Sequence, residues 1–145
     1  MHVTKENGIT PSVVSLVIPA KAEYIALGRL AVTGLLRPLA VEPEVIADVK
    51  LALTEACSNS IRHAYAGGGE GAVEIRYEFL EAGLAVEVSD EGGGFDPSLL
   101  EGDPRELDEG GLGIAIIRAV TDDLSIGPRS GGHGSCLRFT KSLAS

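Results

Sequence analysis

The strongest constraint on the fold comes from two neighbouring segments in which apolar and polar side chains alternate. Residues 73–79 read VEIRYEF, residues 84–88 read LAVEV, and a short turn at residues 81–83 separates them. Alternation with a period of two is typical of a strand with one buried face. Two such strands joined by a tight turn predict a β-hairpin. Other elements of the chain must then cover the apolar face of this hairpin.

Helical periodicity predicts those covering elements. Apolar spacings of three and four residues predict a helix over residues 21–36 and a second one from Pro43 to about residue 65. An apolar segment predicts a third helix over residues 113–121. The stripe expected to be buried in the first helix consists of Tyr24, Leu27, Ala31 and Leu35. The corresponding stripe in the second helix consists of Ile46, Val49, Leu53 and Ala56.

Short β-rich segments at residues 13–18, 124–126 and 135–141 complete the pattern. The predicted order is strand, helix, helix, strand, strand, a long loop over residues 91–110, helix, strand, strand. Adjacent hairpins favour a mixed, mostly antiparallel sheet, and the three helices are left to cover one of its faces. The sequence therefore predicts an α/β two-layer sandwich and disfavours a doubly wound parallel sheet.

Length and charge narrow the class of protein. The chain has 145 residues, of which 12 are basic and 21 acidic, so its formal net charge is −9. The length suits one domain over residues 1–145 with a flexible start at residues 1–12. The acidic balance disfavours nucleic acids and anionic membranes as partners, because both require a cationic face. No apolar stretch approaches a membrane span, no secretory signal precedes the domain, and Cys57 and Cys136 fit reduced thiols, so we expect a cytoplasmic protein.

Polar side chains recur with helical spacing in the second predicted helix. Glu55 and Asn59 are four residues apart and therefore lie one turn from each other, while Arg62 and His63 extend the same face. A carboxylate, a carboxamide and a cation in one line can hold a hydrated metal, a phosphate and a hydroxyl group that loses its proton. A solvated helix face without a function has the same spacing.

Glycine residues mark a second motif at the end of the hairpin. Asp90 ends the second strand, and Gly92 and Gly94 follow it. A carboxylate at a strand end can accept a hydrogen bond from an exocyclic amine, and glycine lets a flat base lie against the backbone. An ordinary Asp-Gly turn gives the same pattern.

A third motif, formed by Gly110, Gly111, Leu112 and Gly113, precedes the third predicted helix. The free N–H groups and the dipole of a helix N-terminus suit an anion such as phosphate. A glycine-containing loop before a core helix is the alternative. The spacing disfavours a dinucleotide fingerprint, and the lack of a Gly-Lys-Ser/Thr sequence excludes a Walker A loop.

The three motifs together, E-x-x-x-N on a helix, D-x-G-x-G after a strand and G-G-L-G before a helix, resemble the nucleotide-binding domain of the GHKL superfamily. The segments TEACSNSIRHAY, EGGLGIAII and GSCLRFTK are most similar to one branch, the anti-sigma-factor serine/threonine kinases of the RsbW type. The resemblance covers residues 13–141. It implies a histidine-kinase-like ATPase fold, ATP and Mg²⁺ as cofactors, and phosphoryl transfer to a partner protein.

The resemblance also assigns roles to individual residues. Glu55 corresponds to the general base, Asn59 to the Mg²⁺ ligand and Asp90 to the adenine-binding carboxylate. Residues 95–110 correspond to a lid over the nucleotide, Ser135 stands at a family threonine position near the adenine, and His63 either contacts the ribose or phosphates or packs. The implied ATP-binding residues are Asn59, Arg62, His63, Asp90, Gly92, Gly94, Phe95, Gly110, Gly111, Leu112, Gly113 and Ser135.

The resemblance implies protein partners as well. These are a sigma factor that the protein holds inactive, a STAS-type anti-anti-sigma protein that it phosphorylates, and a second copy of itself in a homodimer. One departure concerns charge, because Arg105 is the only basic residue between Glu91 and Ile117, and Glu109 stands where some relatives have arginine. This departure favours one alternative, a nucleotide-gated binding module with little kinase activity. A detached histidine-kinase catalytic domain is a further alternative.

Overall fold

The computed structural model describes residues 2–3, 12–65, 71–92, 109–129 and 134–144. The helices of this part are α1 (Ile25–Leu36), α2 (Pro43–Ala64) and α3 (Glu109–Val120), with two short 3₁₀ turns at Ala22–Tyr24 and Arg37–Leu39. Its strands are β1 (His2–Val3), β2 (Ser12–Pro19), β3 (Ala72–Phe79), β4 (Gly83–Asp90), β5 (Asp123–Pro128) and β6 (Ser135–Ser142). None of the described helices is long and apolar enough to cross a membrane.

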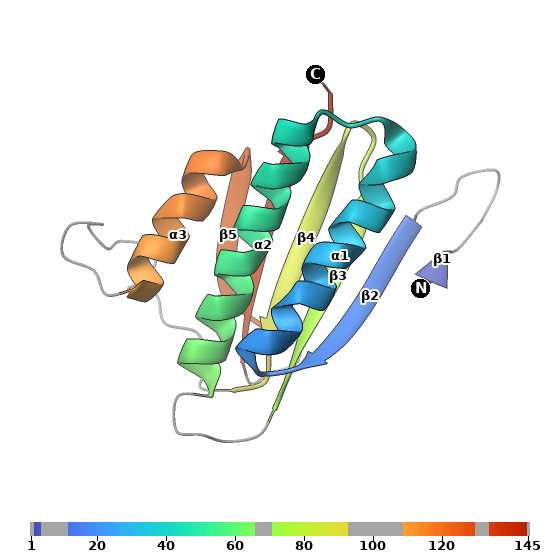
Figure 1. The fold of residues 1–145 in the computed structure, drawn as a ribbon. Helices are drawn as coiled ribbons and strands as arrows, with labels where there is room; N and C mark the ends of the chain where they lie inside the picture. The colour runs from blue at the N-terminus through green and yellow to red at the C-terminus, as the bar shows by residue number, and fades with distance from the viewer. Residues whose placement is uncertain (1, 4–11, 66–70, 93–108, 130–133, 145) are drawn as a thin grey trace.

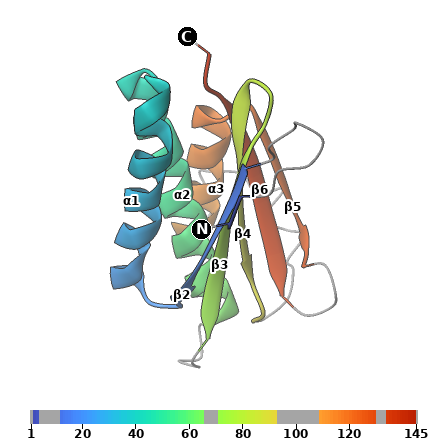
Figure 2. The same ribbon diagram turned by 90° about the vertical axis from the view of Figure 1, so that its right-hand side faces the viewer.

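The described strands form one antiparallel sheet in the order β1-β2-β3-β4-β6-β5. All three helices lie on the same face of this sheet, with α2 between α1 and α3 (Figure 1). The view from the side shows the two layers, helices on one side and strands on the other (Figure 2). The predicted α/β two-layer sandwich is therefore confirmed, and the described strand pairs are antiparallel throughout.

The register of β4 places the end of the hairpin at the centre of the sheet. In the pairing of β3 with β4, Val73 lies opposite Asp90, and in the pairing of β4 with β6, Ser89 lies opposite Cys136. The next residues along these two strands are Asp90 and Ser135. Since side chains alternate between the faces of a sheet, Asp90 points toward the helices, as Val88 does.

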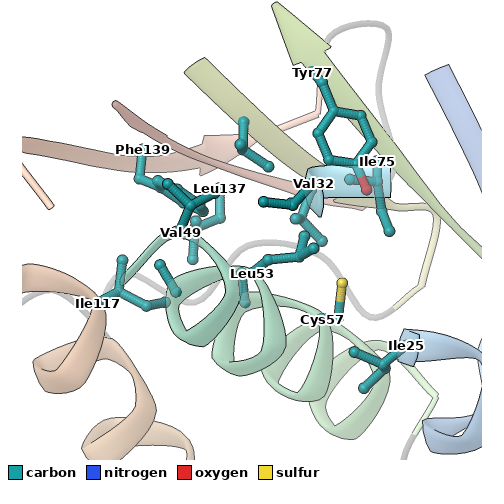
Figure 3. Close-up of a cluster of buried hydrophobic side chains, with 14 of the residues drawn as sticks. Ile25, Val32, Val49, Leu53, Cys57, Ile75, Tyr77, Ile117, Leu137 and Phe139 are labelled. Atoms are coloured by element: carbon teal, nitrogen blue, oxygen red, sulfur yellow. The ribbon is translucent and has the colours of Figure 1, made fainter. Parts of the chain in front are cut away.

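The core lies between the helices and the sheet (Figure 3). The side chain of Cys57 points from α2 toward the sheet and is fully buried, and Val32 and Leu53 lie in the same layer. Tyr77 is also buried, and its hydroxyl group donates a 2.8 Å hydrogen bond to the carbonyl oxygen of Gly28 in α1. Burial raises the pKa of the Cys57 thiol to about 12. Both cysteines are free, and Cys57 fills core space.

The buried stripe of α1 differs from the predicted one. The helix buries Ile25, Gly28, Val32 and Leu36. Tyr24 and Leu27 are exposed, whereas Ala31 and Leu35 are only partly buried. Two apolar stripes run side by side on this helix, and the stripe that contains Gly28 faces inward because the small residue lets α1 approach Tyr77. The stripe predicted for α2 is confirmed, with Val49, Leu53 and Ala56 buried and Ile46 partly buried.

The other face of the sheet carries charged side chains in ion pairs. Arg76 contacts Glu87 at 3.2 Å, and Arg138 contacts both Glu78 at 3.2 Å and Glu87 at 3.4 Å. These four residues lie on three adjacent strands, β3, β4 and β6. In the hairpin, these charged residues occupy the polar positions of the alternating pattern that predicted it. Charged side chains suit this face because none of the described helices covers it.

Candidate active site

Helix α2 carries the first part of the site on the side that faces α3. Glu55 and Asn59 lie one helical turn apart, as predicted, and Arg62 follows within the next turn. Glu55 and Arg62 are half-buried, and Asn59 is only 8% exposed. The backbone of α3 approaches this face at Gly113, where an added Cβ atom would lie 3.7 Å from Glu55 Oε1. The predicted polar face is therefore packed between two helices.

Asn59 has an unmatched acceptor. Its Oδ1 atom is buried, and no described group of the protein donates a hydrogen bond to it. A buried carbonyl oxygen without a donor costs about 1–3 kcal/mol, so native proteins rarely keep one without a purpose. Amide oxygens are ligands that Mg²⁺ accepts together with water and phosphate oxygens. The side chain of Asn59 therefore fits the metal ligand that the sequence predicts.

Asp90 forms the second part of the site. Its side chain is 2% exposed, yet both oxygens are hydrogen-bonded. The hydroxyl groups of Ser60 and Ser135 donate to Oδ2 at 2.6 and 2.9 Å. The main-chain N–H groups of Gly92 and Ser135 donate to Oδ1 at 3.1 and 3.4 Å. A buried carboxylate that accepts hydrogen bonds from several of the described groups suits a role in which it also accepts one from a bound base.

Two glycines bring the backbone close to Asp90. A side chain at Gly92 would collide with the carbonyl oxygen of Ala64 at the end of α2. A side chain at Gly134 would collide with the carbonyl oxygen of Asp90, and Gly134 has a φ of +100° that other residues rarely adopt. The sequence motif predicted the importance of Gly92, whereas Gly134 belongs to none of the three predicted motifs.

Tyr65 connects the end of α2 to the start of β3 and to the backbone that follows β4. Its hydroxyl group donates to the carbonyl oxygen of Ala72 at 2.8 Å and accepts from the N–H group of Glu91 at 3.3 Å. Its ring lies against Gly71, where a side chain would collide with it. These contacts hold the backbone that follows Asp90 against the helix that carries Glu55 and Asn59.

The third part of the site differs from the prediction in its secondary structure. Helix α3 begins at Glu109, not at Gly113, so the glycines lie within its first turns. Gly110 and Gly111 lie in the first turn of this helix, next to its positive dipole end, and Leu112 and Gly113 follow directly. The helix can start at the glycines because their lack of side chains allows close packing on α2, and Gly111 and Gly113 are buried.

The described residues thus bring most of the predicted site together around the C-terminal half of α2. Gly94, Phe95 and almost all of the predicted lid lie outside the described residues, and so does the side chain of His63. Ser60 was missed by the sequence analysis. One signal could have revealed it, because it continues the buried apolar stripe of α2 as a polar residue.

Comparisons with known proteins identify the family of the chain. The histidine kinase-like ATPase domain family matches residues 18–141. A serine-protein kinase RsbW from Listeria innocua is 36% identical, with 78% of each chain covered. The serine-protein kinase RsbW of Bacillus pumilus is 34% identical, with 90% of this chain and 87% of that protein covered.

Solved structures show the same fold at lower identity. One is the structure of the RsbU and RsbW domains of a Mycobacterium tuberculosis protein, with a TM-score of 0.68 at 18% identity. The match covers 92% of this chain and 33% of that chain. The catalytic domain of the histidine kinase ThkA has a TM-score of 0.55 at 17% identity and covers 91% of this chain and 97% of that domain. The chain belongs to the histidine kinase-like ATPase domain family, in its branch of RsbW-type serine-protein kinases. The predicted family is confirmed, together with its class of enzyme, the ATP-dependent protein kinases.

Proposed function

We propose that this protein transfers the γ-phosphoryl group of ATP to a serine or threonine of a partner protein, with Glu55 as the general base. The observation that carries the proposal is the α2 face on which the Glu55 carboxylate lies one turn from the unmatched Oδ1 of Asn59. A proton acceptor beside a metal ligand is the pair of groups that phosphoryl transfer needs, because positioning and charge stabilisation supply most of its rate.

Glu55 and Asn59 define how the phosphoryl transfer proceeds. The hydroxyl oxygen of the partner's serine forms a bond to the γ-phosphorus, and the bond from that phosphorus to the bridging oxygen breaks, so ADP leaves. The proton of the hydroxyl group passes to the Glu55 carboxylate. Asn59 Oδ1 would hold Mg²⁺, which, when bound, neutralises charge on the phosphate oxygens.

Recognition of ATP is assigned to the other two parts of the site. The Asp90 carboxylate accepts a hydrogen bond from the exocyclic amine of adenine, and Gly92 and Ser135 border the base. The N–H groups of Gly110 and Gly111 at the start of α3 face the phosphates, to which the helix dipole is also favourable. Arg62, on the same face of α2 as Glu55, supplies positive charge near the γ-phosphate.

The family supports the choice of partners. The kinase phosphorylates a STAS-type anti-anti-sigma protein, and a second surface holds an RNA polymerase sigma factor inactive in the cytoplasm. Phosphorylation of the antagonist keeps the sigma factor bound, as suits a stress-response regulator. The protein acts as a homodimer.

A transfer assay tests the enzyme. The protein is incubated with γ-labelled ATP, Mg²⁺ and a STAS protein that carries the acceptor serine. Glu55→Gln should lower the transfer rate by about 100-fold or more, because it removes the proton acceptor but keeps the shape of the side chain. Its affinity for ATP, measured by calorimetry, should stay within about three-fold of the wild type. Transfer by Glu55→Gln at the wild-type rate would contradict the role of Glu55.

The binding module is the second candidate, and one feature favours it. Arg105 is the only basic residue between Glu91 and Ile117, so this stretch offers little charge to offset a transferring phosphoryl group. The same assay separates the two candidates. Tight binding of Mg-ATP with no label on the partner, at any partner concentration, supports the module and excludes the kinase.

A further inference from the structure

The hydroxyl group of Ser60 makes the shortest hydrogen bond to Asp90. Ser60 is 6% exposed and lies on the side of α2 that faces the sheet, where its neighbours along the stripe are apolar. Its Oγ donates to Asp90 Oδ2 at 2.6 Å across a sequence separation of 30 residues. A polar group in such a place is tolerated only because it is paired, and a bond to a carboxylate is stronger than one between neutral groups.

The four donors around Asp90 are not equivalent. A carboxylate accepts about four hydrogen bonds, and Asp90 already receives four. Two of the donors are main-chain N–H groups, which the end of β4 and the start of β6 hold in place. Of the two hydroxyl groups, that of Ser135 is the more exposed, and a hydroxyl group rotates freely about its C–O bond. The hydroxyl group of Ser60 is enclosed.

We propose that Ser60 is a positioning residue that sets the preference of the site for a base with an exocyclic amine. Ser60 holds Oδ2 and so fixes the plane of the Asp90 carboxylate. The Ser135 hydroxyl group then gives up its place to the arriving amine. This inference rests on the proposed function, because it assumes that Asp90 contacts the base.

The consequence for binding is specific. The terminal torsion of an aspartate side chain has a broad energy profile, and the N–H groups of Gly92 and Ser135 bind Oδ1 only at 3.1 and 3.4 Å, so loss of the 2.6 Å bond from Ser60 to Oδ2 lets the carboxylate reorient. Without the Ser60 hydroxyl group, Asp90 would present its oxygens to an amine in several orientations, and the strength of that one hydrogen bond would fall. A base that lacks the amine gains nothing from Asp90, so its affinity is insensitive to Ser60.

The test compares ATP with purine riboside triphosphate, which has the same ring and phosphates but no amine. Dissociation constants are measured by calorimetry with Mg²⁺ for the wild type and Ser60→Ala. The wild type should prefer ATP, and Ser60→Ala should lower that preference about ten-fold by weakening the binding of ATP alone. In the transfer assay KM for ATP should rise while kcat stays within about two-fold, because Glu55 is untouched.

Two further variants complete the test. Ser60→Thr keeps a hydroxyl group at this position and should restore the preference for ATP. Ser89→Ala is the matched control: Ser89 is also a buried serine, 8% exposed, and precedes Asp90, but it points to the other face of the sheet. It should leave the preference unchanged. If Ser60→Ala does not fold by circular dichroism, Ser60→Cys under reducing conditions replaces it, and its thiol, a weak donor, should give the same loss.

Each outcome of these binding measurements either supports or overturns the proposed role of Ser60. An unchanged preference in Ser60→Ala, or in Ser60→Cys, would overturn the role of Ser60 while Glu55-dependent transfer remains intact. An equal loss of affinity for both triphosphates would reduce Ser60 to a structural residue and overturn the proposal as well. A wild type that binds both triphosphates equally would contradict the assignment of Asp90 to the base, and the proposal for Ser60 with it.

Discussion

At the scale of single residues, Asp90 is the point at which three elements converge. Its carboxylate receives hydrogen bonds from α2, from the start of β6 and from the backbone that follows β4. The strand end and the nearby glycines made this residue visible in the sequence. The donors were not visible, because Ser60 and Ser135 lie 30 and 45 residues away along the chain and only the packing of α2 on the sheet brings them together.

The substitution Asp90→Asn tests whether the Asp90 carboxylate and its hydrogen bonds are needed to bind ATP. An amide has one acceptor oxygen and one NH₂ group, so at least one of the present donors would face another donor. We expect ATP affinity to fall by about ten-fold or more, because both the base contact and the surrounding hydrogen bonds are lost. Calorimetry measures the affinity. A stabilisation by Mg-ATP equal to that of the wild type, in a thermal-shift experiment, would contradict the assignment of Asp90 to the base.

Gly134 offers a second test at this scale. Gly134→Ala should lower the free energy of unfolding by about 1–3 kcal/mol, because of the positive φ and the collision with the Asp90 carbonyl oxygen. Gly127→Ala is the control, since an added Cβ atom at this β5 glycine meets nothing within 4 Å and no positive φ is involved. Urea denaturation measures both. Equal stability of the two variants would mean that the backbone at Gly134 relaxes without cost.

At the scale of elements, the sequence predicted the existence and the order of the helices and strands better than their faces and ends. Strict alternation identified the hairpin, and the spacing of Val49, Leu53 and Ala56 identified the buried stripe of α2. In α1 two apolar stripes compete, and the choice depends on Tyr77, which is distant in sequence. The start of α3 was placed too late, since glycine disfavours helices by propensity and only packing against α2 overrides this.

The two glycines of α1 give a matched pair of predictions. Gly34→Ala should raise the free energy of unfolding by about 0.5–1 kcal/mol, since an added Cβ atom meets nothing within 4 Å and alanine favours a helix. Gly28→Ala should lower it, because its Cβ atom would lie 3.0 Å from Ile75 Cδ1 and 3.3 Å from the Tyr77 hydroxyl oxygen. Chemical denaturation compares them. A stabilised Gly28→Ala variant would show that α1 can move away from the sheet.

At the scale of the whole molecule, the two faces of the sheet differ in chemistry. One face joins the helices around an apolar core, and the other carries ion pairs between adjacent strands. Exposed ion pairs contribute little to stability, typically below about 1 kcal/mol each, so the core determines the stability of the fold. This division follows directly from the alternation seen in the sequence, and it explains why the fold class could be predicted although the details of the site could not.

The buried thiol of Cys57 gives the whole molecule a pH dependence in alkaline solution. Its pKa rises from the ordinary 9.0 to about 12 on folding, so the thiol favours the folded state below pH 9, and this contribution is lost as the pH rises toward 12. By pH 10.5 the loss should reach about 2 kcal/mol of the free energy of unfolding. Urea denaturation of the wild type and Cys57→Ala between pH 8 and 10.5 measures it. The variant should show a shallower decline, and parallel curves would contradict the burial of the thiol as the cause.

Asn59 and Ser60 are consecutive residues of α2, and one is assigned to the metal and the other to the carboxylate that holds the base. Under this assignment the spacing of these two side chains on one helix would set the distance between the phosphates and the base of a bound nucleotide. The site would therefore select nucleotides by the distance between their base and their phosphates. Nucleotides with a longer or shorter link between base and phosphates would satisfy one end of the pocket and miss the other.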